Sequence, residues 1–305
     1  MVKSTNTEMV LTERLRRLAG AGRGSGVKLG IGDDCAIVQA AAREDLLLTT
    51  DMTIEGVHFR RATHTPEDAG WKAMARALSD IAAMGGAARF CLVSLAAAEW
   101  TDAEWIAGFY RGLLKLARRE GVMLAGGDLA RARQFTCDIV AGGAAPRGRA
   151  LRRDGARAGD AIYVSGALGG SALGLATRRG QAWKRHTRPE PRLALGRFLR
   201  QRLHATAAMD LSDGLSLDLH RLCVASGLRA EIAEPPLFPG ASLEMALHGG
   251  EDYELLFTVP ARTRVPERAA GVRLAPIGTM RKGPAGAVAL NGVPLAPLGY
   301  DHFRK

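Results

Sequence analysis

Segments with the pattern of β-strands alternate with segments that have the pattern of α-helices along most of this 305-residue chain. The apolar run 46–50 predicts a buried strand, and 65–86 predicts a helix, since it begins Thr-Pro and ends Gly-Gly. A segment rich in arginine and glycine, 146–159, precedes a second series of such patterns. We therefore expect a mixed α/β (α+β) architecture with two domains, residues 1–148 and 149–305.

The apolar content excludes two broad classes of protein. Apolar residues make up 47% of the chain, which is enough to bury a core in each domain, so disorder is not the expected state. The longest apolar run, 90–98, is too short to cross a bilayer, and residues 1–10 lack the apolar stretch of a signal peptide. We expect a cytoplasmic protein that does not span a membrane.

The net charge of +11 fits nucleic-acid binding, attraction of phosphorylated small molecules, or merely an arginine-rich surface. Aromatic residues, on which bases stack, are only 5% of the chain, so nucleic acid is not favoured. The four cysteines are scattered without a CxxC pair, which indicates neither a disulfide framework nor a zinc site.

The first residues suggest a helix and a loop. Leu11, Leu15 and Leu18 have helical spacing, which predicts a helix over 7–19, and the glycine-rich segment that follows predicts a flexible loop. The chain contains no GxxxxGK[ST] sequence, so this loop is not a Walker-type phosphate loop.

Acidic residues recur beside Gly, Ser or Thr, next to apolar runs. Such places are typical of strand ends, where backbone closely approaches a ligand. Carboxylates at several strand ends can converge. The motifs are GDD (Asp33, Asp34), TTD (Asp51), LSD (Asp80), GGD (Asp128), MDLSD (Asp210, Asp213) and GGED (Glu251, Asp252).

Converging carboxylates repel one another unless cations neutralise them, and hard oxygen ligands suit magnesium. Magnesium usually binds through a few carboxylates together with substrate phosphates, so the motifs favour phosphoryl transfer from a nucleotide. Each motif also has a plainer interpretation. Gly-Asp pairs form turns, Asp80 can pair with Arg76 four residues earlier, and Asp213 can cap a helix.

Nine segments, taken in order along the chain, are informative together: GIGDDCAIV, LLLTTDMTIEGVHF, ARALSDIAAMG, LAGGD, RALRRDGARAGDAIYVSG, MDLSDGLSLDL, GGEDYELLFTV, PIGTM and GYDHF. They closely resemble segments of thiamine-monophosphate kinases. The resemblance implies an architecture shared with aminoimidazole ribonucleotide synthetase and selenophosphate synthetase, and a homodimer formed through the N-terminal sheet. It implies ATP-dependent phosphorylation of thiamine monophosphate, with several Mg²⁺ ions.

The same resemblance implies roles for individual residues. Asp51 is the most critical of the metal ligands, and no dedicated base is expected. The metal ligands would be Asp34, Thr49, Thr50, Asp51, Asp80, Asp128, Asp210 and Asp213; ATP would meet Gly127, Arg153 and Ser212; thiamine phosphate would meet His58, Glu251 and Tyr300. The plainer alternatives are an exposed Arg153, a core Tyr300 and a His58 that only caps a strand.

The chain departs from the family pattern at three places. Leu129 and Ala130 follow GGD where a small polar residue is usual, and Ala77 stands where asparagine is usual. Thr49 replaces a frequent serine and keeps the hydroxyl. A sister synthetase of the same fold, or a basic nucleic-acid-binding protein that is not an enzyme, are the alternative functions.

Overall fold

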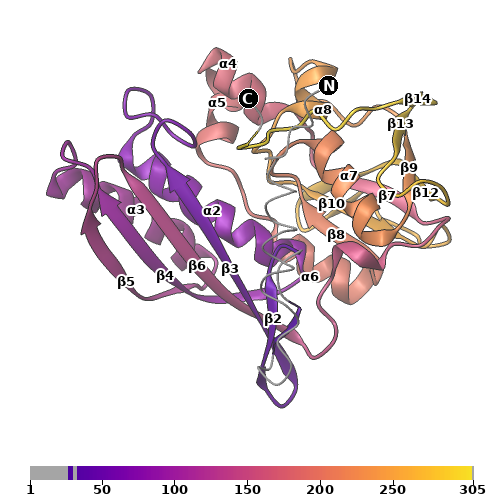
Figure 1. Ribbon diagram of the computed structural model, residues 1–305, viewed down its shortest axis with the longest axis horizontal. Coiled ribbons are helices and arrows are strands. Elements are labelled where there is room, and N and C mark those ends of the chain that lie inside the picture. The colour runs from indigo at the N-terminus through magenta and orange to yellow at the C-terminus, as the bar shows by residue number, and fades with distance from the viewer. Residues whose placement is uncertain (1–26, 30–32, 304–305) are drawn as a thin grey trace.

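The computed structural model describes residues 27–29 and 33–303. The helix expected over 7–19 and the glycine-rich segment after it lie outside these residues. Two sheets, each covered by helices, lie side by side, with the N-terminal half at the left of Figure 1 and the C-terminal half at the right. Among the described residues no helix is long and apolar enough to cross a membrane.

The N-terminal sheet has the strand order β1-β2-β3-β6-β4-β5 within the described residues. The pairs are antiparallel except β4 with β5, which run parallel because α3 connects them. The strands are β1 (Val27–Leu29), β2 (Ala36–Ala41), β3 (Glu44–Ile54), β4 (Ala87–Ala97), β5 (Met123–Arg131) and β6 (Thr136–Pro146).

Two helices of the N-terminal half, α2 (Pro66–Ala83) and α3 (Ala103–Arg119), cover one face of this sheet (Figure 1). The predicted start of α2 is confirmed, since the Thr65 side chain accepts a hydrogen bond from the Asp68 N–H. The helix α3 is capped by Asp102.

The C-terminal sheet has the order β14-β13-β9-β12-β7-β10-β8, with β11 beside β12, among the described residues. Its strands are β7 (Ala161–Ser165), β8 (Ala207–Asp210), β9 (Arg229–Ile232), β10 (Leu255–Val259), β11 (Arg268–Ala269), β12 (Val272–Arg281), β13 (Val288–Leu290) and β14 (Val293–Pro294).

The C-terminal half also carries several short helices. They are η1 (Arg153–Gly155), α4 (Gly170–Thr177), α5 (Gly180–Thr187), α6 (Leu193–Phe198), the π-helical turn η2 (Leu199–Leu203), α7 (Leu215–Ser226) and α8 (Leu243–His248). The arginine-rich segment 191–205 has a pattern that predicts a helix. The structure forms α6 there and then a wider π turn that ends at His204 in the left-handed conformation.

The two halves are packed together through α2. One hydrophobic core contains residues of both, from Leu78 on α2 to Leu199 on η2 and Phe257 on β10. The helix α6 approaches α2 so closely that a Cβ on Gly196 would lie 1.9 Å from the Ala82 carbonyl oxygen, which only glycine permits. This close packing fixes where α2 presents its side chains to the C-terminal half.

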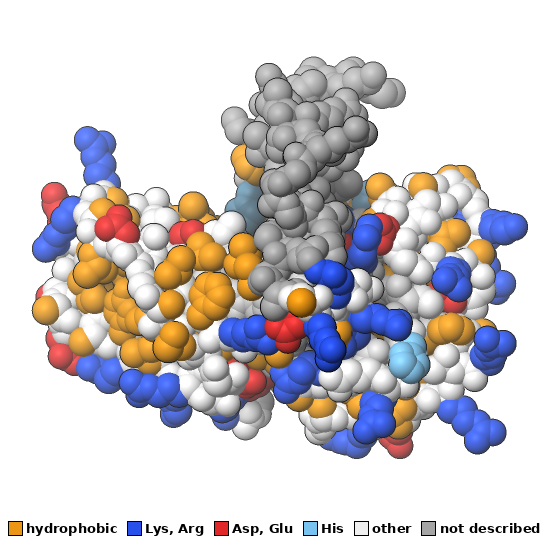
Figure 2. Space-filling view, turned by 90° about the horizontal axis from the view of Figure 1, so that it is seen from below, with side chains coloured by type: hydrophobic (Ala, Val, Ile, Leu, Met, Phe, Trp, Pro, Cys, Tyr) orange, Lys and Arg blue, Asp and Glu red, His pale blue; other side chains and the backbone are white. Residues whose placement is uncertain are grey.

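The two faces of the N-terminal sheet differ. Because side chains alternate along a strand, Thr49 and Asp51 of β3 lie on the face covered by α2, whereas Thr50 and Met52 lie on the outer face. The outer face is not covered by any described residue, and Figure 2 shows hydrophobic side chains gathered on this half of the molecule. Met52, Leu92 and Met123 are 50%, 37% and 66% exposed.

Candidate active site between the two halves

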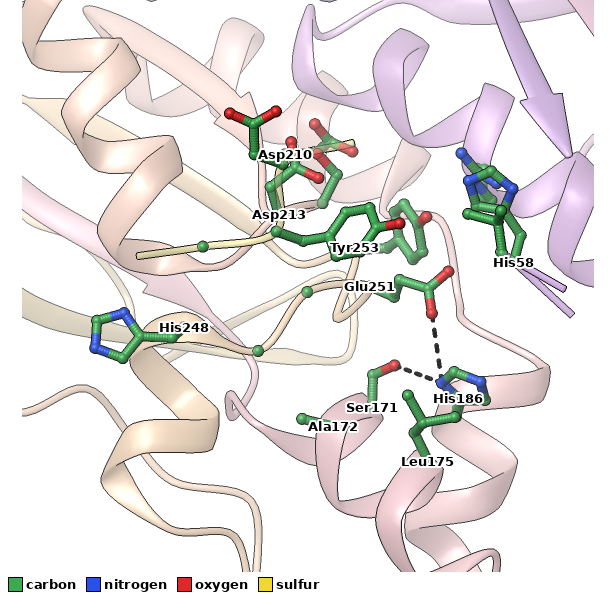
Figure 3. Close-up of a pocket in the computed structure, with 18 of the residues that line it drawn as sticks. His58, Ser171, Ala172, Leu175, His186, Asp210, Asp213, His248, Glu251 and Tyr253 are labelled. Atoms are coloured by element: carbon green, nitrogen blue, oxygen red, sulfur yellow. Dashed lines mark hydrogen bonds and ion pairs between the residues drawn. The ribbon is translucent and has the colours of Figure 1, made fainter. Parts of the chain in front are cut away.

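A cavity of about 840 Å³ lies where the two halves meet. Asp51, His58, Arg76 and Asp80 line it from the N-terminal half, and the loops before α7 and after α8 line it from the C-terminal half. Figure 3 shows Asp210 and Asp213 at one end of the cavity and Glu251, His186 and Ser171 at the other. Residues that are far apart in the sequence therefore form one site.

Three of the predicted metal ligands converge. Carboxylate oxygens of Asp34, Asp80 and Asp210 all lie within 4.8 Å of one another, and this is the single such acidic group found among the described residues. Asp34 precedes β2, Asp80 is near the end of α2, and Asp210 ends β8. The helix and the two strand ends bring these carboxylates together at one point.

The trio is electrostatically unfavourable without a cation. Burial raises the pKa of Asp80 and of Asp210 well above the ordinary value, and neighbouring carboxylates raise both further. Thr49 Oγ1 donates to Asp80 and Ser79 Oγ donates to Asp210, so hydroxyls meet part of the negative charge. A donor set of buried carboxylate oxygens beside a hydroxyl fits Mg²⁺.

Asp51 lies next to the trio and is paired with Arg76. The Arg76 Nη2 is 2.7 Å from the Asp51 Oδ1. Burial raises the pKa of Asp51 to about 6, although Arg76 lowers it. The plainer interpretation of LSD, a pair between Arg76 and Asp80, is wrong, because the Arg76 side chain reaches β3 and Asp80 instead accepts from Thr49.

The loop between β8 and α7 adds Ser212 and Asp213 to the cavity wall. Asp213 is paired with Arg221 and does not cap α7, so the capping alternative is wrong. Asp218 Oδ2 instead accepts the N–H groups of Asp213 and Gly214 at 3.0 and 3.1 Å. Asp218 thus holds the loop in place from within α7.

Arg153 contacts the acidic end as well. Its guanidinium is paired with Asp34, and its backbone N–H donates to Asp33 Oδ2 at 3.1 Å. Burial raises the pKa of Asp33 to about 6, and the charge of Asp34 adds to this shift. Arg153 is mostly buried, which differs from the alternative of an exposed arginine.

The structure does not bring Thr50 and Asp128 to the trio. The register places Asp128, Ser94, Asp138 and Met52 in one row across the outer face of the sheet. Thr50 lies on this face too, where its Oγ1 donates to Asp138 Oδ1 at 2.6 Å.

Gly127 lies beside Asp128 on β5, outside the cavity lining. A Cβ at this position would lie 1.9 Å from the Val93 carbonyl oxygen, so close packing of β5 on β4 requires glycine here.

The other end of the cavity is built around Glu251. The residues 251–253 follow α8, and Glu251 and Tyr253 both have positive φ, +66° and +49°. Backbone hydrogen bonds from Glu251 N to Ser212 O and from Tyr253 N to Leu211 O, 2.7 and 2.9 Å, hold this loop against the β8–α7 loop. Such strained backbone is maintained only where its surroundings enforce it, and it is frequent at binding sites.

A buried lysine that the sequence analysis missed neutralises Glu251. The Lys72 side chain is 0% exposed, and its Nζ donates to Glu251 Oε2 at 2.8 Å and to the His58 carbonyl oxygen at 2.9 Å. Although burial raises the pKa of Glu251, Lys72, His186 and Arg76 lower it to about 2. The carboxylate is therefore ionised and held in one position.

His186 on α5 is the second missed residue. Its ring lies 3.5 Å from Glu251 Oε2 and 3.0 Å from Ser171 Oγ (Figure 3). Burial and the charge of Lys72 lower its pKa to about 3, so the ring is neutral near pH 7. Lys72, Arg76 and Asp80 recur every four residues on α2, and this charged stripe in an apolar helix is a signal that could have revealed the lysine.

His58 and Tyr300 both line the cavity. The His58 Nδ1 accepts a hydrogen bond from the Ile54 N–H at 2.9 Å, so the ring closes the end of β3 as well as facing the cavity. Burial lowers its pKa to about 3. Tyr300 is 49% exposed, so it is not a core tyrosine, and its backbone N–H donates to Asp213 O at 2.9 Å.

Two of the departures from the family pattern lie away from the cavity lining. Ala77 is fully buried inside α2, and Leu129 is 67% exposed on β5. Neither side chain replaces a polar group at the cavity wall.

Comparisons with known proteins agree with this architecture. A family model described as AIR synthase related protein, N-terminal domain, matches residues 32–145, and one described as AIR synthase related protein, C-terminal domain, matches residues 157–291. The predicted fold class, two mixed α/β domains of this type, is confirmed. The boundary expected near residue 148 lies in the interval between the two matches.

The chain is 38% identical over 305 residues to thiamine-monophosphate kinase of Escherichia coli strain K12, which covers 91% of this chain and 92% of that one. It is 35% identical over 311 residues to thiamine-monophosphate kinase of Bacillus subtilis strain 168, covering 92% and 95%. A solved structure described as AaThiL complexed with AMPPCP and TMP superposes with a TM-score of 0.86 at 31% identity, covering 99% of each chain. The sequence identity to these two kinases extends over nearly the whole length of the chain. The chain therefore belongs to the thiamine-monophosphate kinase family.

Proposed function

We propose that this enzyme transfers the γ-phosphoryl group of ATP to thiamine monophosphate, giving thiamine diphosphate and ADP, with several Mg²⁺ ions and by in-line displacement. Family membership and the relative with AMPPCP and TMP bound support both substrates. Since ATP is a substrate, we expect the reaction to take place in the cytoplasm.

One observation carries the proposal. A single cavity is lined at one end by Asp80 and Asp210, which belong to the carboxylate trio, and at the other by the ionised Glu251 with Tyr300 nearby. The first arrangement suits cations bound to phosphates, and the second suits a cationic, amine-bearing ring system. Thiamine monophosphate presents a phosphate at one end and a thiazolium with an aminopyrimidine at the other, so it matches the two ends of the cavity.

The chemistry needs no base from the protein. The nucleophile is a phosphate oxygen that is already ionised at neutral pH; it forms a bond to the γ-phosphorus while the bond from that phosphorus to the β–γ bridging oxygen breaks, and ADP leaves. His58 and His186 are neutral and remain so. Bound Mg²⁺ would supply positive charge to the two phosphate groups that must approach.

The chain's own residues position the reactants. The GGED loop holds Glu251 toward the aminopyrimidine, while His58 and Tyr300 lie beside the thiamine rings. Arg153 and Ser212, and Gly127 on β5, would meet ATP. The metal ligands in this proposal are Asp34, Thr49, Thr50, Asp51, Asp80, Asp128, Asp210 and Asp213, with Asp51 the most critical.

Thr50 and Asp128 lie on the outer sheet face, so their part in metal binding depends on what covers that face. We propose that a second copy of the chain covers it. The face carries partly exposed Leu46, Leu48 and Phe90 as well as Leu92 and Met123, which is the composition of a homodimer interface.

The test is conversion of thiamine monophosphate by the purified protein with ATP. We expect thiamine diphosphate and ADP in equal amounts when Mg²⁺ is present and none in excess EDTA, measured by separation of the thiamine species. Unphosphorylated thiamine is the matched control acceptor, because it lacks the attacking oxygen anion. ATP consumption with either acceptor but without thiamine diphosphate would refute the proposal.

A further inference from the structure

We propose that Arg76 is a direct phosphate-binding residue of this cavity, and that its guanidinium receives the phosphate of thiamine monophosphate without a metal ion between them. The inference rests on the proposed function, because it names a protein group that binds that substrate. It assigns to Arg76 a role beyond that of counter-ion to Asp51.

The hydrogen bonds of Arg76 are incomplete. Its side chain is only 11% exposed and lines the cavity, and one nitrogen, Nη2, is paired with Asp51. The other two nitrogens, Nε and Nη1, are buried and have no hydrogen-bond partner among the described residues. Buried N–H groups almost always have a partner, so donors left without one in a cavity wall indicate a ligand that accepts hydrogen bonds.

A guanidinium is suited to such a ligand. Its N–H groups are arranged as a planar fork that matches two oxygens of a phosphate, and the group stays charged at any working pH. Asp51 is paired with Nη2, the nitrogen that the two edges of the guanidinium share. Nε and Nη1 lie on different edges, so each is left to donate a separate hydrogen bond to an anion.

A second incomplete group lies across the same cavity. Oxygen Oε2 of Glu251 accepts from Lys72, but the buried Oε1 has no partner among the residues that the structure describes. A single ligand that accepts hydrogen bonds at Arg76 and donates one to Glu251 would satisfy both groups. Thiamine monophosphate has both features, since its phosphate accepts hydrogen bonds and its aminopyrimidine donates them.

The position of Arg76 on α2 also fits. Arg76 is one helical turn after Lys72, which holds Glu251, and one turn before Asp80 of the carboxylate trio. A phosphate on Arg76 is therefore held between the thiamine end and the metal end of the cavity. This is where the acceptor oxygen has to be for transfer.

The experiment compares binding of thiamine monophosphate and of thiamine by calorimetry in excess EDTA, without ATP. The deciding pair is Asp51→Asn and the double variant Arg76→Met/Asp51→Asn. Both variants lack the Asp51 carboxylate, so neither leaves that aspartate buried without its counter-ion. The two variants differ only in the Arg76 guanidinium. Any effect of breaking the Arg76–Asp51 ion pair is therefore the same in both. Thermal melts verify that both are folded.

We expect the wild-type protein and Asp51→Asn to bind thiamine monophosphate more tightly than thiamine. The double variant should lose about 10- to 100-fold in affinity for the monophosphate, the range of a charged hydrogen-bonded contact, and bind thiamine as before. Equal affinities of Asp51→Asn and the double variant for the monophosphate would overturn the inference and leave Arg76 as a counter-ion.

Failure of the proposed function is distinguishable from failure of this inference. If the proposed function is wrong, the wild-type protein forms no thiamine diphosphate in the kinase assay. If only the role of Arg76 is wrong, wild-type turnover remains intact while the two variants bind thiamine monophosphate equally well without metal.

Discussion

The two ends of the cavity both bury acidic side chains, but they neutralise them differently. At one end, carboxylate oxygens of Asp34, Asp80 and Asp210 lie within 4.8 Å of one another, and within the described part of the chain hydroxyls and the Arg153 guanidinium contact them. At the other end, Lys72 donates directly to Glu251, with His186 beside it. The fold neutralises the charge of Glu251 by itself, whereas the three aspartates are neutralised only with cations. Under the proposed function, we expect such a cavity to bind the thiamine part of the substrate without the metal-bound nucleotide.

The largest effect is expected from breaking the acidic end. Asp210→Asn removes one carboxylate of the trio, and we expect turnover to fall about a thousandfold, because a metal ion that neutralises reacting phosphates contributes several kcal/mol to the barrier. The melting temperature without Mg²⁺ should not fall, since a repelling buried charge is lost. Steady-state kinetics and thermal melts measure both.

Asp154→Asn is the matched control, because Asp154 is exposed and lies outside the cavity lining. Asp154→Asn should change neither the turnover nor the melting temperature without Mg²⁺. A turnover of Asp210→Asn close to that of this control would contradict the role of the trio.

Removing the Lys72–Glu251 ion pair at the thiamine end should mainly lower the free energy of unfolding. Lys72→Met leaves Glu251 buried without its counter-ion, and we expect the free energy of unfolding to drop by about 3 kcal/mol. Adding Glu251→Gln should restore a large part of this loss, because no uncompensated charge then remains. Chemical denaturation measures the three proteins, with the exposed Lys184→Met as the control. No loss in Lys72→Met would show that the lysine does not hold the carboxylate.

The comparison of the two ends shows what a sequence of this kind can predict. Short acidic motifs at strand ends predicted that carboxylates such as Asp34 and Asp210 converge, because the local pattern places them at the edge of a sheet. Asp80 joins them from the helix α2 instead. Strand alternation could have separated Thr50 from Asp51, since neighbours on a strand face opposite ways.

The thiamine end was less predictable. The family resemblance pointed to Glu251, but the groups that hold it come from α2 and α5, and their meeting depends on how the two halves pack. The Lys72, Arg76 and Asp80 stripe is visible in the sequence, yet it is typical of a solvated helix face. His186 has no local signal, because only tertiary packing brings α5 to Glu251.

A third, smaller effect follows from protonation at the acidic end. The pKa of Asp51 is raised from 3.8 to about 6 by burial, so its contribution to stability is present below pH 3.8 and is lost as the pH rises through 6. Mg²⁺ needs the ionised carboxylate. The rise in melting temperature on adding Mg²⁺ should therefore be larger at pH 8 than at pH 5.

The buried histidines His58 and His186 also make the melting temperature depend on pH. Mg²⁺ does not change their contribution, so it cancels when the melting temperatures with and without Mg²⁺ are compared at the same pH. A rise in melting temperature that is equal at both pH values would contradict metal binding at ionised, buried carboxylates.

The smallest effect is expected at the exposed edge of the thiamine end. Tyr300→Ala should raise the KM for thiamine monophosphate about threefold, the size of an exposed cation–π contact, and leave the KM for ATP unchanged. Phe303→Ala is the control, because Phe303 is similarly exposed but does not line the cavity. Equal changes for both substrates would argue against stacking by Tyr300.

The most direct test of the difference between the two ends is the binding of each substrate to the wild-type protein, measured separately with Mg²⁺ and with EDTA. We expect the affinity for thiamine monophosphate to change little, because the proposed site of Lys72, Glu251 and Arg76 needs no metal. We expect the affinity for ATP to fall at least about 100-fold in EDTA. Equal loss of both affinities on metal removal would contradict this difference between the two ends.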